Sequence, residues 1–273
     1  TVQVLMEPGR SDSQKSYMWV FRGGEPDRPV LSYQYHPTRA GSVPLNYLEG
    51  FKGYVQNDGY IGYDALGRKP GIVMLGCWAH ARRKFHDVIQ AAGAQIAQRR
   101  LAAEEALEFI KKLYQIEKEA RLKALPAPVL CELRQEQAKP ILEEFKNWLD
   151  EKAPLTPPGG LLGKAIGYTL NQWSRLIVYL QDGRLRPDNN LVENAIRPFV
   201  VGRKNWLFSG HPRGAEASAL LYSLIETAKA NGLKPYAYIR YLFDQLILAK
   251  TEEDYRNLLP PYMDASRLNP TAA

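Results

Sequence analysis

The sequence predicts an α/β protein with a mixed-sheet core, interrupted by a helical insertion and followed by a helical C-terminal segment. Short runs of β-branched and aromatic residues, typical of strands, occur within residues 1–77. From about residue 91 to 181 these runs stop, and Ala, Leu, Glu, Lys and Gln dominate. Amphipathic helical spacing returns after residue 190. Strands and helices in this order are typical of an α/β core.

The first three predicted strands lie close together in the chain. Val2–Met6 and Tyr17–Phe21 carry the residues that strands favour, and Gly23–Asp27 has the composition of a turn. Val30–Tyr35 forms the third strand. We expect a short antiparallel meander.

Two more strands and two helices follow. A helix begins near Ser42, and the fourth strand, Tyr54–Asn57, ends at Asp58. Ile72–Leu75 forms the fifth strand and leads directly into a helix over Ala79–Ile89. Together with the meander, these elements predict a mixed sheet.

The insertion is predicted to consist of long helices. Gln95–Lys123 and Val129–Lys152 are rich in helix-forming residues, and Pro140 should kink or divide the second. Leu155–Gly160 forms a linker. A long buried helix is then indicated by apolar positions at four- and three-residue spacing: Leu162, Ile166, Thr169, Trp173, Leu176 and Leu180.

The C-terminal part predicts three helices and a tail. The first carries Glu193, the second spans Ala217–Ala228 and ends at Asn231–Gly232, and the third includes residues 238–246. The proline-rich tail after Leu259 is expected to be extended.

Composition describes a basic, globular chain. Among 273 residues, 45% are hydrophobic, and the net charge is +7. No apolar run approaches the roughly 20 residues needed to cross a bilayer, so we expect no membrane partner. The two cysteines, Cys77 and Cys131, are expected to be free thiols of a cytoplasmic protein, and a single disulfide between them is the alternative.

The basic residues are concentrated in two places. Between Arg184 and Arg213 there are six Arg or Lys residues against two acids, and Arg82-Arg83-Lys84 forms a second cluster. Such clusters can be no more than a solvated surface. Because the larger one is interleaved with aromatic residues and a carboxylate, we favour a polyanionic partner, most plausibly nucleic acid.

Two carboxylates are candidate metal ligands. Asp58 directly follows a strand, where its side chain would be rigidly aimed, although Asn57-Asp58-Gly59 could equally be a simple turn. Glu193 lies among basic residues, but it could instead close a capping box with Asn190 or pair with Arg197. Asp188 is a further carboxylate or an alternative cap.

Several long motifs resemble the transposase of the insertion sequence 66 family. The resemblance covers nearly the whole chain, and the motifs are specific because they are long and occur in order. They are residues 57–60 (Asn-Asp-Gly-Tyr), 76–85 (from Gly-Cys-Trp-Ala-His), 188–193 (Asp-Asn-Asn-Leu-Val-Glu), 202–208 (Gly-Arg-Lys-Asn-Trp-Leu-Phe) and 223–232 (from Ser-Leu-Ile-Glu-Thr).

The resemblance implies a DDE transposase with a ribonuclease-H-like core. It implies that Asp58 and Glu193 are catalytic acids that hold two divalent ions, Mg²⁺ or Mn²⁺. The partners would be transposon-end and target DNA, in a homo-oligomeric complex within the bacterial nucleoid. The DNA-binding residues would be Arg82, Arg83, Lys84, Arg197, Arg203 and Lys204.

The resemblance also implies a division of the chain and a missing residue. Residues 1–90 would be the first part of the core, 91–182 the insertion, 183–232 the second part with the third-acid helix, and 233–273 the C-terminal helix and tail. In the family, the first acid precedes a Thr that matches Thr1, so we expect a fragment or remnant that binds DNA but cleaves and joins it poorly.

Two other functions remain open from the sequence. A nuclease on the same core would cleave DNA without joining it. A non-catalytic DNA-binding or assembly protein would use the carboxylates Asp58 and Glu193 only as helix and turn caps.

Overall fold

The computed structural model describes residues 2–3, 15–91 and 97–268. The chain divides into two compact units: residues 1–43 with 191–273, and residues 44–190. Helix α1 (Ser42–Tyr47) begins at Ser42, where the sequence predicted a helix, and spans the boundary between the two units. The parts of the predicted segments that fall on residues 4–6 and 95–96, and the end of the predicted tail after 268, lie outside the described residues.

The first unit contains an antiparallel sheet with the strand order β1-β2-β3. Its strands are β1 (Val2–Gln3), β2 (Tyr17–Glu25) and β3 (Arg28–His36). The meander expected from the sequence is therefore present, with the second and third strands longer than predicted.

The predicted turn at Gly23–Asp27 is wrong in extent, because the hairpin turns only at Pro26 and Asp27. Gly24 pairs with Pro29 within the ladder and has a φ of +86°. A Cβ at Gly24 would lie 2.3 Å from the Arg28 carbonyl oxygen. Glycine thus permits this close pairing within the strand.

Helices α8 (Asn190–Trp206) and α9 (Pro212–Ala230) provide the other half of the first unit's core. Phe199 is fully buried, and the centre of its ring lies 5.1 Å from the ring centre of Tyr222 and 6.4 Å from that of Tyr33. The buried residues of this core are Met18, Leu31, Tyr33, Ala195, Phe199, Ala215 and Ala219.

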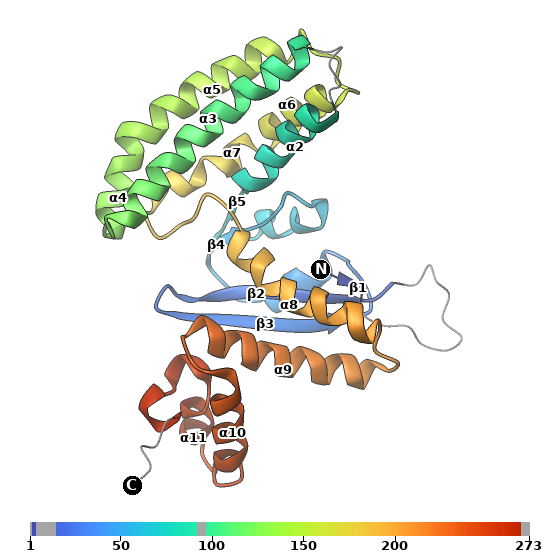
Figure 1. Cartoon of the computed structure of the whole chain (residues 1–273), viewed down its shortest axis with the longest axis vertical. Helices are drawn as coiled ribbons and strands as arrows, with labels where there is room; N and C mark the ends of the chain where they lie inside the picture. The colour runs from blue at the N-terminus through green and yellow to red at the C-terminus, as the bar shows by residue number, and fades with distance from the viewer. Residues whose placement is uncertain (1, 4–14, 92–96, 269–273) are drawn as a thin grey trace. The chain divides into compact units, whose positions relative to one another are not determined.

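Side chains of helix α9 form hydrogen bonds with the backbone groups of β3 on the edge that faces away from β2 (Figure 1). Four residues of helix rise about 6 Å and two residues of strand about 6.6 Å, so polar side chains at four-residue spacing match alternate strand residues. The bonds run from Tyr33 N–H to Ser223 Oγ (2.8 Å), from Leu31 N–H to Thr227 Oγ1 (3.0 Å) and from Asn231 Nδ2 to the Pro29 carbonyl (2.8 Å).

The C-terminal region is helical further than expected. Helix α10 (Pro235–Leu246) was predicted, but α11 (Glu252–Asn257) was not. A capping box between Thr251 and Asp254 begins α11. The prediction of an extended tail is wrong for the described residues, because 3₁₀ turns form at η5 (Pro260–Tyr262) and η6 (Ala265–Leu268).

The second unit contains a two-stranded parallel sheet of β4 (Gly53–Gln56) and β5 (Ile72–Leu75). Two 3₁₀ turns, η1 (Ile61–Tyr63) and η2 (Leu66–Arg68), lie in the connection. The expected single mixed sheet is therefore wrong for the described residues. Their parallel and antiparallel ladders share no strand, so each unit has its own small sheet within a mixed α/β chain.

Helices make up the rest of the second unit, and α3 packs beside α2 and α5 (Figure 1). Phe145 lies at the centre of their core, stacked 4.9 Å from Phe109 and in contact with Trp78 and Trp173. The elements are α2 (Trp78–Ala91), α3 (Ala97–Leu122), α4 (Ala127–Leu133), the π-turn η3 (Arg134–Ala138), α5 (Lys139–Lys152), α6 (Leu161–Asn171), α7 (Trp173–Leu176) and η4 (Val178–Gln181).

The structure tests two predictions about these helices. Pro140 does not end the helix: it is the second residue of α5, and the chain remains helical from α4 through the π-turn η3 into α5, so the only irregularity in this described stretch is the π-turn just before it. The single long helix predicted over 162–180 is wrong. It breaks at Gln172, whose φ of −96° and ψ of 0° are not helical, although Leu162, Ile166 and Leu176 are buried as expected.

Arg134, in the π-turn, is the most deeply buried cation of the described residues, with 1% of its side chain exposed. Its guanidinium forms a two-point ion pair with Glu117 on α3, with both N–O distances at 2.8 Å. The same group donates to the carbonyl oxygens of Tyr179, Asp182 and Leu185. It therefore joins two helices to the segment that leads towards residue 190.

The edge contacts of α9 predict a specific loss of stability. We expect Thr227→Val to lower the free energy of unfolding by about 2–4 kcal/mol, because the buried N–H and C=O of Leu31 lose their partner. Urea denaturation measures the change. Ser218→Ala on the same helix, whose hydroxyl bonds only back to the Gly214 carbonyl, should cost about 0.5 kcal/mol or less. Equal losses in the two variants would contradict the role of Thr227.

Candidate functional site

Asp58 lies in a tight turn directly after β4. Asn57 extends the strand pairing by one bond, from its N–H to the Leu75 carbonyl at 3.1 Å. The Asn57 side chain then accepts from Gly59 N–H at 2.7 Å, and Gly59 has a φ of +80°. The interpretation of Asn57-Asp58-Gly59 as a turn is confirmed, and that turn holds Asp58 at the carboxyl end of a parallel strand.

The Asp58 carboxylate is half-buried and only partly engaged. Its Oδ1 accepts from Tyr60 N–H at 3.0 Å, while Oδ2 has no hydrogen-bond partner in the described part of the chain. The main-chain oxygen of Asp58 accepts from the Tyr168 hydroxyl at 2.9 Å. The backbone is thus fixed while one carboxylate oxygen stays available to a ligand.

Tyr168 of α6 connects Asp58 with the basic helix α2. The Lys84 ammonium lies 4.7 Å from the centre of the Tyr168 ring, a cation–π contact. Burial raises the pKa of Tyr168, and the nearby Cys77 and Asp58 raise it further. The hydroxyl therefore stays protonated and donates its hydrogen to the Asp58 backbone.

The segment at 186–189 is bonded to the last residue of β4 and to Cys77, which follows β5. Gln56 Nε2 donates to the carbonyls of Gly76 and Arg186, at 3.0 and 2.9 Å. The thiol of buried Cys77 donates to Asn189 Oδ1 at 3.0 Å. Both parallel strands and this segment therefore meet at one edge of the second unit.

Asp188 is buried and fully hydrogen-bonded. Its Oδ2 accepts from the Tyr114 hydroxyl of α3 at 2.9 Å, and its Oδ1 accepts from Asn190 N–H at 3.1 Å. This bond forms a turn that leads into α8, whereas the side chain of a helix N-cap accepts from the second or third helical N–H. The cap alternative considered for Asp188 is therefore not shown.

In the first unit, α8 presents Glu193, Arg197 and Lys204 on one face. At about 100° per residue these three positions lie within a narrow sector, roughly opposite buried Ala195 and Phe199. Glu193 is half-buried, and the two cations are exposed. One helix therefore carries a carboxylate and two cations about one and three turns away, and Pro198 lies inside that helix between Arg197 and Lys204.

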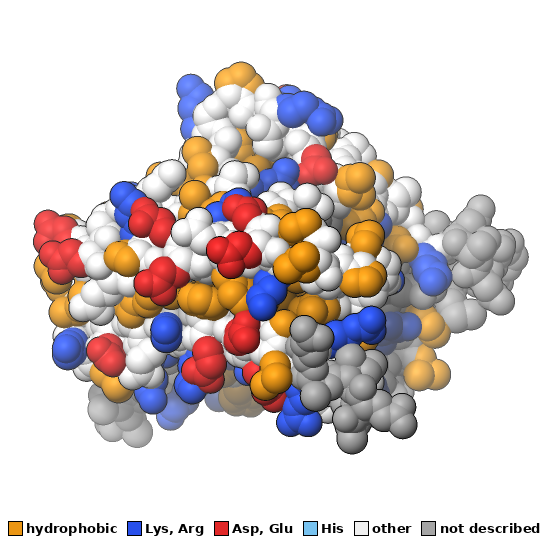
Figure 2. Space-filling model, turned by 90° about the horizontal axis from the view of Figure 1, so that it is seen from above, with side chains coloured by type: hydrophobic (Ala, Val, Ile, Leu, Met, Phe, Trp, Pro, Cys, Tyr) orange, Lys and Arg blue, Asp and Glu red, His pale blue; other side chains and the backbone are white. Residues whose placement is uncertain are grey.

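The remaining predicted DNA-binding residues differ in how exposed they are and in their aromatic contacts. Arg203 Nε donates to the Leu207 carbonyl at 3.1 Å, and its guanidinium lies 4.5 Å from the Phe208 ring centre. On α2, Arg82 and Arg83 are exposed, whereas Lys84 is half-buried beside Tyr168. On the face shown in Figure 2, basic and acidic side chains are interspersed.

The structure brings together some of the predicted residues. Asp58 and Lys84 meet through Tyr168 in the second unit, and Glu193, Arg197 and Lys204 share a face in the first. Within the described residues, no group of three or more His, Cys, Asp or Glu is placed to hold a metal ion. The assignments of Asp58 and Glu193 as catalytic metal ligands stay predictions.

Sequence reasoning missed Tyr114 and Tyr168. Tyr168 directly precedes Thr169, one of the regularly spaced positions between Leu162 and Leu180. Tyr114 lies beside buried Leu113 in a long helix. Neither spacing nor residue type separates such tyrosines from ordinary core residues. Only the hydrogen bonds of their hydroxyl groups do so.

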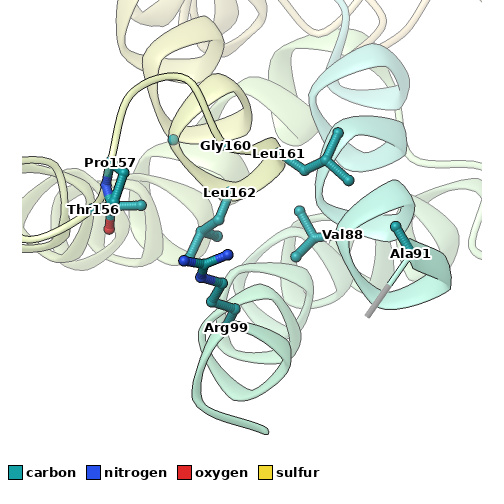
Figure 3. Close-up of a pocket in the computed structure, with 9 residues that line it drawn as sticks. Val88, Ala91, Arg99, Thr156, Pro157, Gly160, Leu161 and Leu162 are labelled. Carbon is teal, nitrogen blue, oxygen red and sulfur yellow. The ribbon is translucent and has the colours of Figure 1, made fainter. Parts of the chain in front are cut away.

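A separate hollow lies at the junction of α2, α3 and the loop before α6 (Figure 3). Val88, Leu161 and Leu162 line it with apolar groups, and Arg99 borders it. None of the predicted catalytic residues is among those that line it. We therefore place the candidate chemistry elsewhere.

Comparison with known families agrees with the motifs. Residues 1–217 match the family described as transposase IS66, and residues 223–260 match the IS66 C-terminal element. The chain belongs to the IS66 transposase family. The first match includes Asp58, the 186–190 segment and Glu193.

Relatives of this IS66-family chain occur in Sinorhizobium fredii (strain NBRC 101917 / NGR234). The uncharacterized protein y4jD is 31% identical over 271 residues, which cover 94% of this chain and 51% of that protein. The uncharacterized protein y4qI is 30% identical over 273 residues, covering 95% and 49%. The chain thus spans about half the length of these relatives. No solved structure matches it significantly.

Two further observations complete the site's setting. No helix among the described residues is long and apolar enough to cross a membrane. Both cysteines are free, as predicted, with Cys77 buried and Cys131 partly exposed.

The buried thiol of Cys77 predicts a pH dependence of stability. Burial raises the pKa of Cys77 from its ordinary 9.0 to about 11. Between these values the unfolded chain ionises and the folded chain does not, so stability falls as pH rises. We expect Cys77 to account for a loss of about 2–3 kcal/mol between pH 8 and pH 11.

Urea denaturation at several pH values measures this contribution as the difference between wild type and Cys77→Ala. Cys131→Ala, which removes the other thiol of the chain, serves as the matched control. Parallel slopes for wild type and Cys77→Ala would show that the thiol ionises equally in both states.

Proposed function

We propose that this chain is the catalytic region of a DDE-type DNA transposase, with a ribonuclease-H-like core that performs metal-dependent phosphoryl transfer during insertion-sequence transposition. The observation that carries the proposal is the placement of Asp58 on a fixed turn at the end of a parallel strand, within a family match that also includes Glu193. A rigid strand-end carboxylate is suited to holding a catalytic metal ion.

The available donors suit Mg²⁺ or Mn²⁺. Both ions prefer oxygen ligands, and Asp58 Oδ2 is free of other partners among the described residues. Asp58 and Glu193 would hold the ions. When bound, such ions activate an attacking water or hydroxyl and stabilise the leaving oxygen in phosphoryl transfer.

The chain's own residues would orient and neutralise the DNA. Exposed Arg197 and Lys204 on α8, and Arg82 and Arg83 on α2, would contact DNA phosphates. Lys84 and Arg203 are tied to aromatic rings, so we assign them mainly to shaping the surface. In a homo-oligomer that holds two DNA ends, each copy would supply one such set of residues.

A crystal soaked in manganese tests the metal site. We expect an anomalous peak at the Asp58 carboxylate, shared with Glu193, that is lost in Asp58→Asn and weakened in Glu193→Gln. Asp64→Asn is the matched control, because Asp64 is ion-paired with Arg175 at 2.8 Å and should not affect the peak.

An empty site with Asp58 and Glu193 far apart would contradict the proposal. The non-catalytic DNA-binding or assembly function would then replace it. Metal binding with DNA cleavage but no joining would instead favour a nuclease on the same core.

DNA binding gives an independent prediction. For a 30-base-pair duplex, we expect Arg197→Gln with Lys204→Gln to reduce the slope of log affinity against log salt by about 2, close to 0.9 for each lost phosphate contact. Fluorescence anisotropy between roughly 50 and 200 mM salt measures this slope. Lys111→Gln, which removes an exposed lysine bonded to Glu108 on α3, should leave it unchanged. An unchanged slope in the α8 variant would remove that helix from the DNA interface.

A further inference from the structure

We propose that Tyr114 and Asp188 form a positioning pair that fixes the start of α8 and thereby the orientation of Glu193. Tyr114 belongs to α3, within the helical insertion, so the insertion would contribute directly to the catalytic arrangement. The inference rests on the proposed function, because it gives a catalytic purpose to the placement of Glu193.

The contacts form a continuous chain of hydrogen bonds. The Tyr114 hydroxyl donates to Asp188 Oδ2 at 2.9 Å, and Asn190 N–H donates to Asp188 Oδ1 at 3.1 Å. Asn190 is the first residue of α8, and Glu193 follows in its first turn. A helix is stiff over one turn, so an anchored Asn190 restricts where Glu193 can lie.

A second tie holds the neighbouring residue. The Cys77 thiol donates to Asn189 Oδ1 at 3.0 Å, and Cys77 directly precedes α2. Two consecutive residues, Asp188 and Asn189, are therefore bonded through their side chains to α3 and to the residue before α2. An ordinary helix cap needs only one such contact.

Burial explains why Tyr114 is needed. Asp188 is only 6% exposed, and a buried carboxylate is costly unless its oxygens are hydrogen-bonded. Burial and the charge of Asp188 raise the pKa of Tyr114, so its hydroxyl remains a donor throughout the neutral range. Arg82 lies close enough to oppose that shift, and places a positive charge near the pair.

The alternative role for Asp188, as a third metal ligand, fits these contacts less well. Both of its oxygens already accept hydrogen bonds from protein donors. Asp58 differs in having one oxygen available. The two carboxylates therefore suit different tasks, Asp58 binding and Asp188 positioning.

The test measures amide exchange at residues 190–195 by NMR, together with Mn²⁺ affinity and the urea midpoint, on the whole chain. Tyr114→Phe deletes only the hydroxyl, and Asp188→Ala deletes both bonds. We expect exchange to accelerate about fivefold or more in each, with Mn²⁺ affinity lowered severalfold. Asp188→Asn keeps Oδ1 as an acceptor and should restore most of the protection at Asn190.

Tyr255→Phe is the matched control, because it also removes one tyrosine hydroxyl bond, to the Ala249 carbonyl. It should change neither the exchange at residues 190–195 nor Mn²⁺ affinity. Unchanged exchange in Tyr114→Phe would overturn the inference. Acceleration spread evenly through α3 and α8, with a lowered urea midpoint, would also overturn it, by showing a general stabilising contact.

Failure of the proposed function would be seen separately. Asp58→Asn and Glu193→Gln remove the expected ligands without touching Tyr114 or Asp188. If neither changed Mn²⁺ affinity, the metal site would be wrong, whereas local exchange in Tyr114→Phe would still decide whether the pair positions α8.

Discussion

The second unit depends on one buried cation, Arg134. Its guanidinium spans the two-point pair with Glu117 and the carbonyls of Tyr179, Asp182 and Leu185. Because an unpaired buried charge is costly, these acceptors must converge on the π-turn for the unit to fold. Arg134 thereby places the end of η4 and the segment that continues to residue 190. Helices of the insertion thus act as a scaffold for residues well beyond the insertion.

The candidate site is built on that scaffold from hydrogen bonds to the backbone. Gln56 and Cys77 bond to the 186–189 segment from the ends of β4 and β5, while Tyr168 fixes the Asp58 turn. Asp58 keeps one oxygen available, whereas Asp188 uses both. Most polar groups around Asp58 are therefore held by hydrogen bonds, while one Asp58 oxygen remains available to a ligand. Electrostatic and metal-assisted catalysis depends on side chains that are held in place in this way.

Several elements could be predicted from local sequence alone. Pro140 lacks an N–H and lies where the π-turn η3 passes into α5, and Asn231-Gly232 ends α9, with Gly232 at a φ of +73°. Other predictions failed because long-range contacts decided the outcome. Gly23 and Gly24 resemble a turn, yet pairing with β3 draws them into the strand. The apolar spacing over 162–180 identified buried positions but could not show the break at Gln172.

The sequence by itself determined the family, the strand-end position of Asp58 and the shared helix of Glu193 and Arg197, because motifs and short-range periodicity are properties of neighbouring residues. Only the tertiary structure decided that the hydroxyl groups of Tyr114 and Tyr168 bond to Asp188 and to the Asp58 backbone, and that both oxygens of Asp188 are occupied. Tyr114 and Asp188 are 74 residues apart in the chain. No local pattern specifies such a hydrogen bond, because it forms only when packing of the helices removes both groups from water.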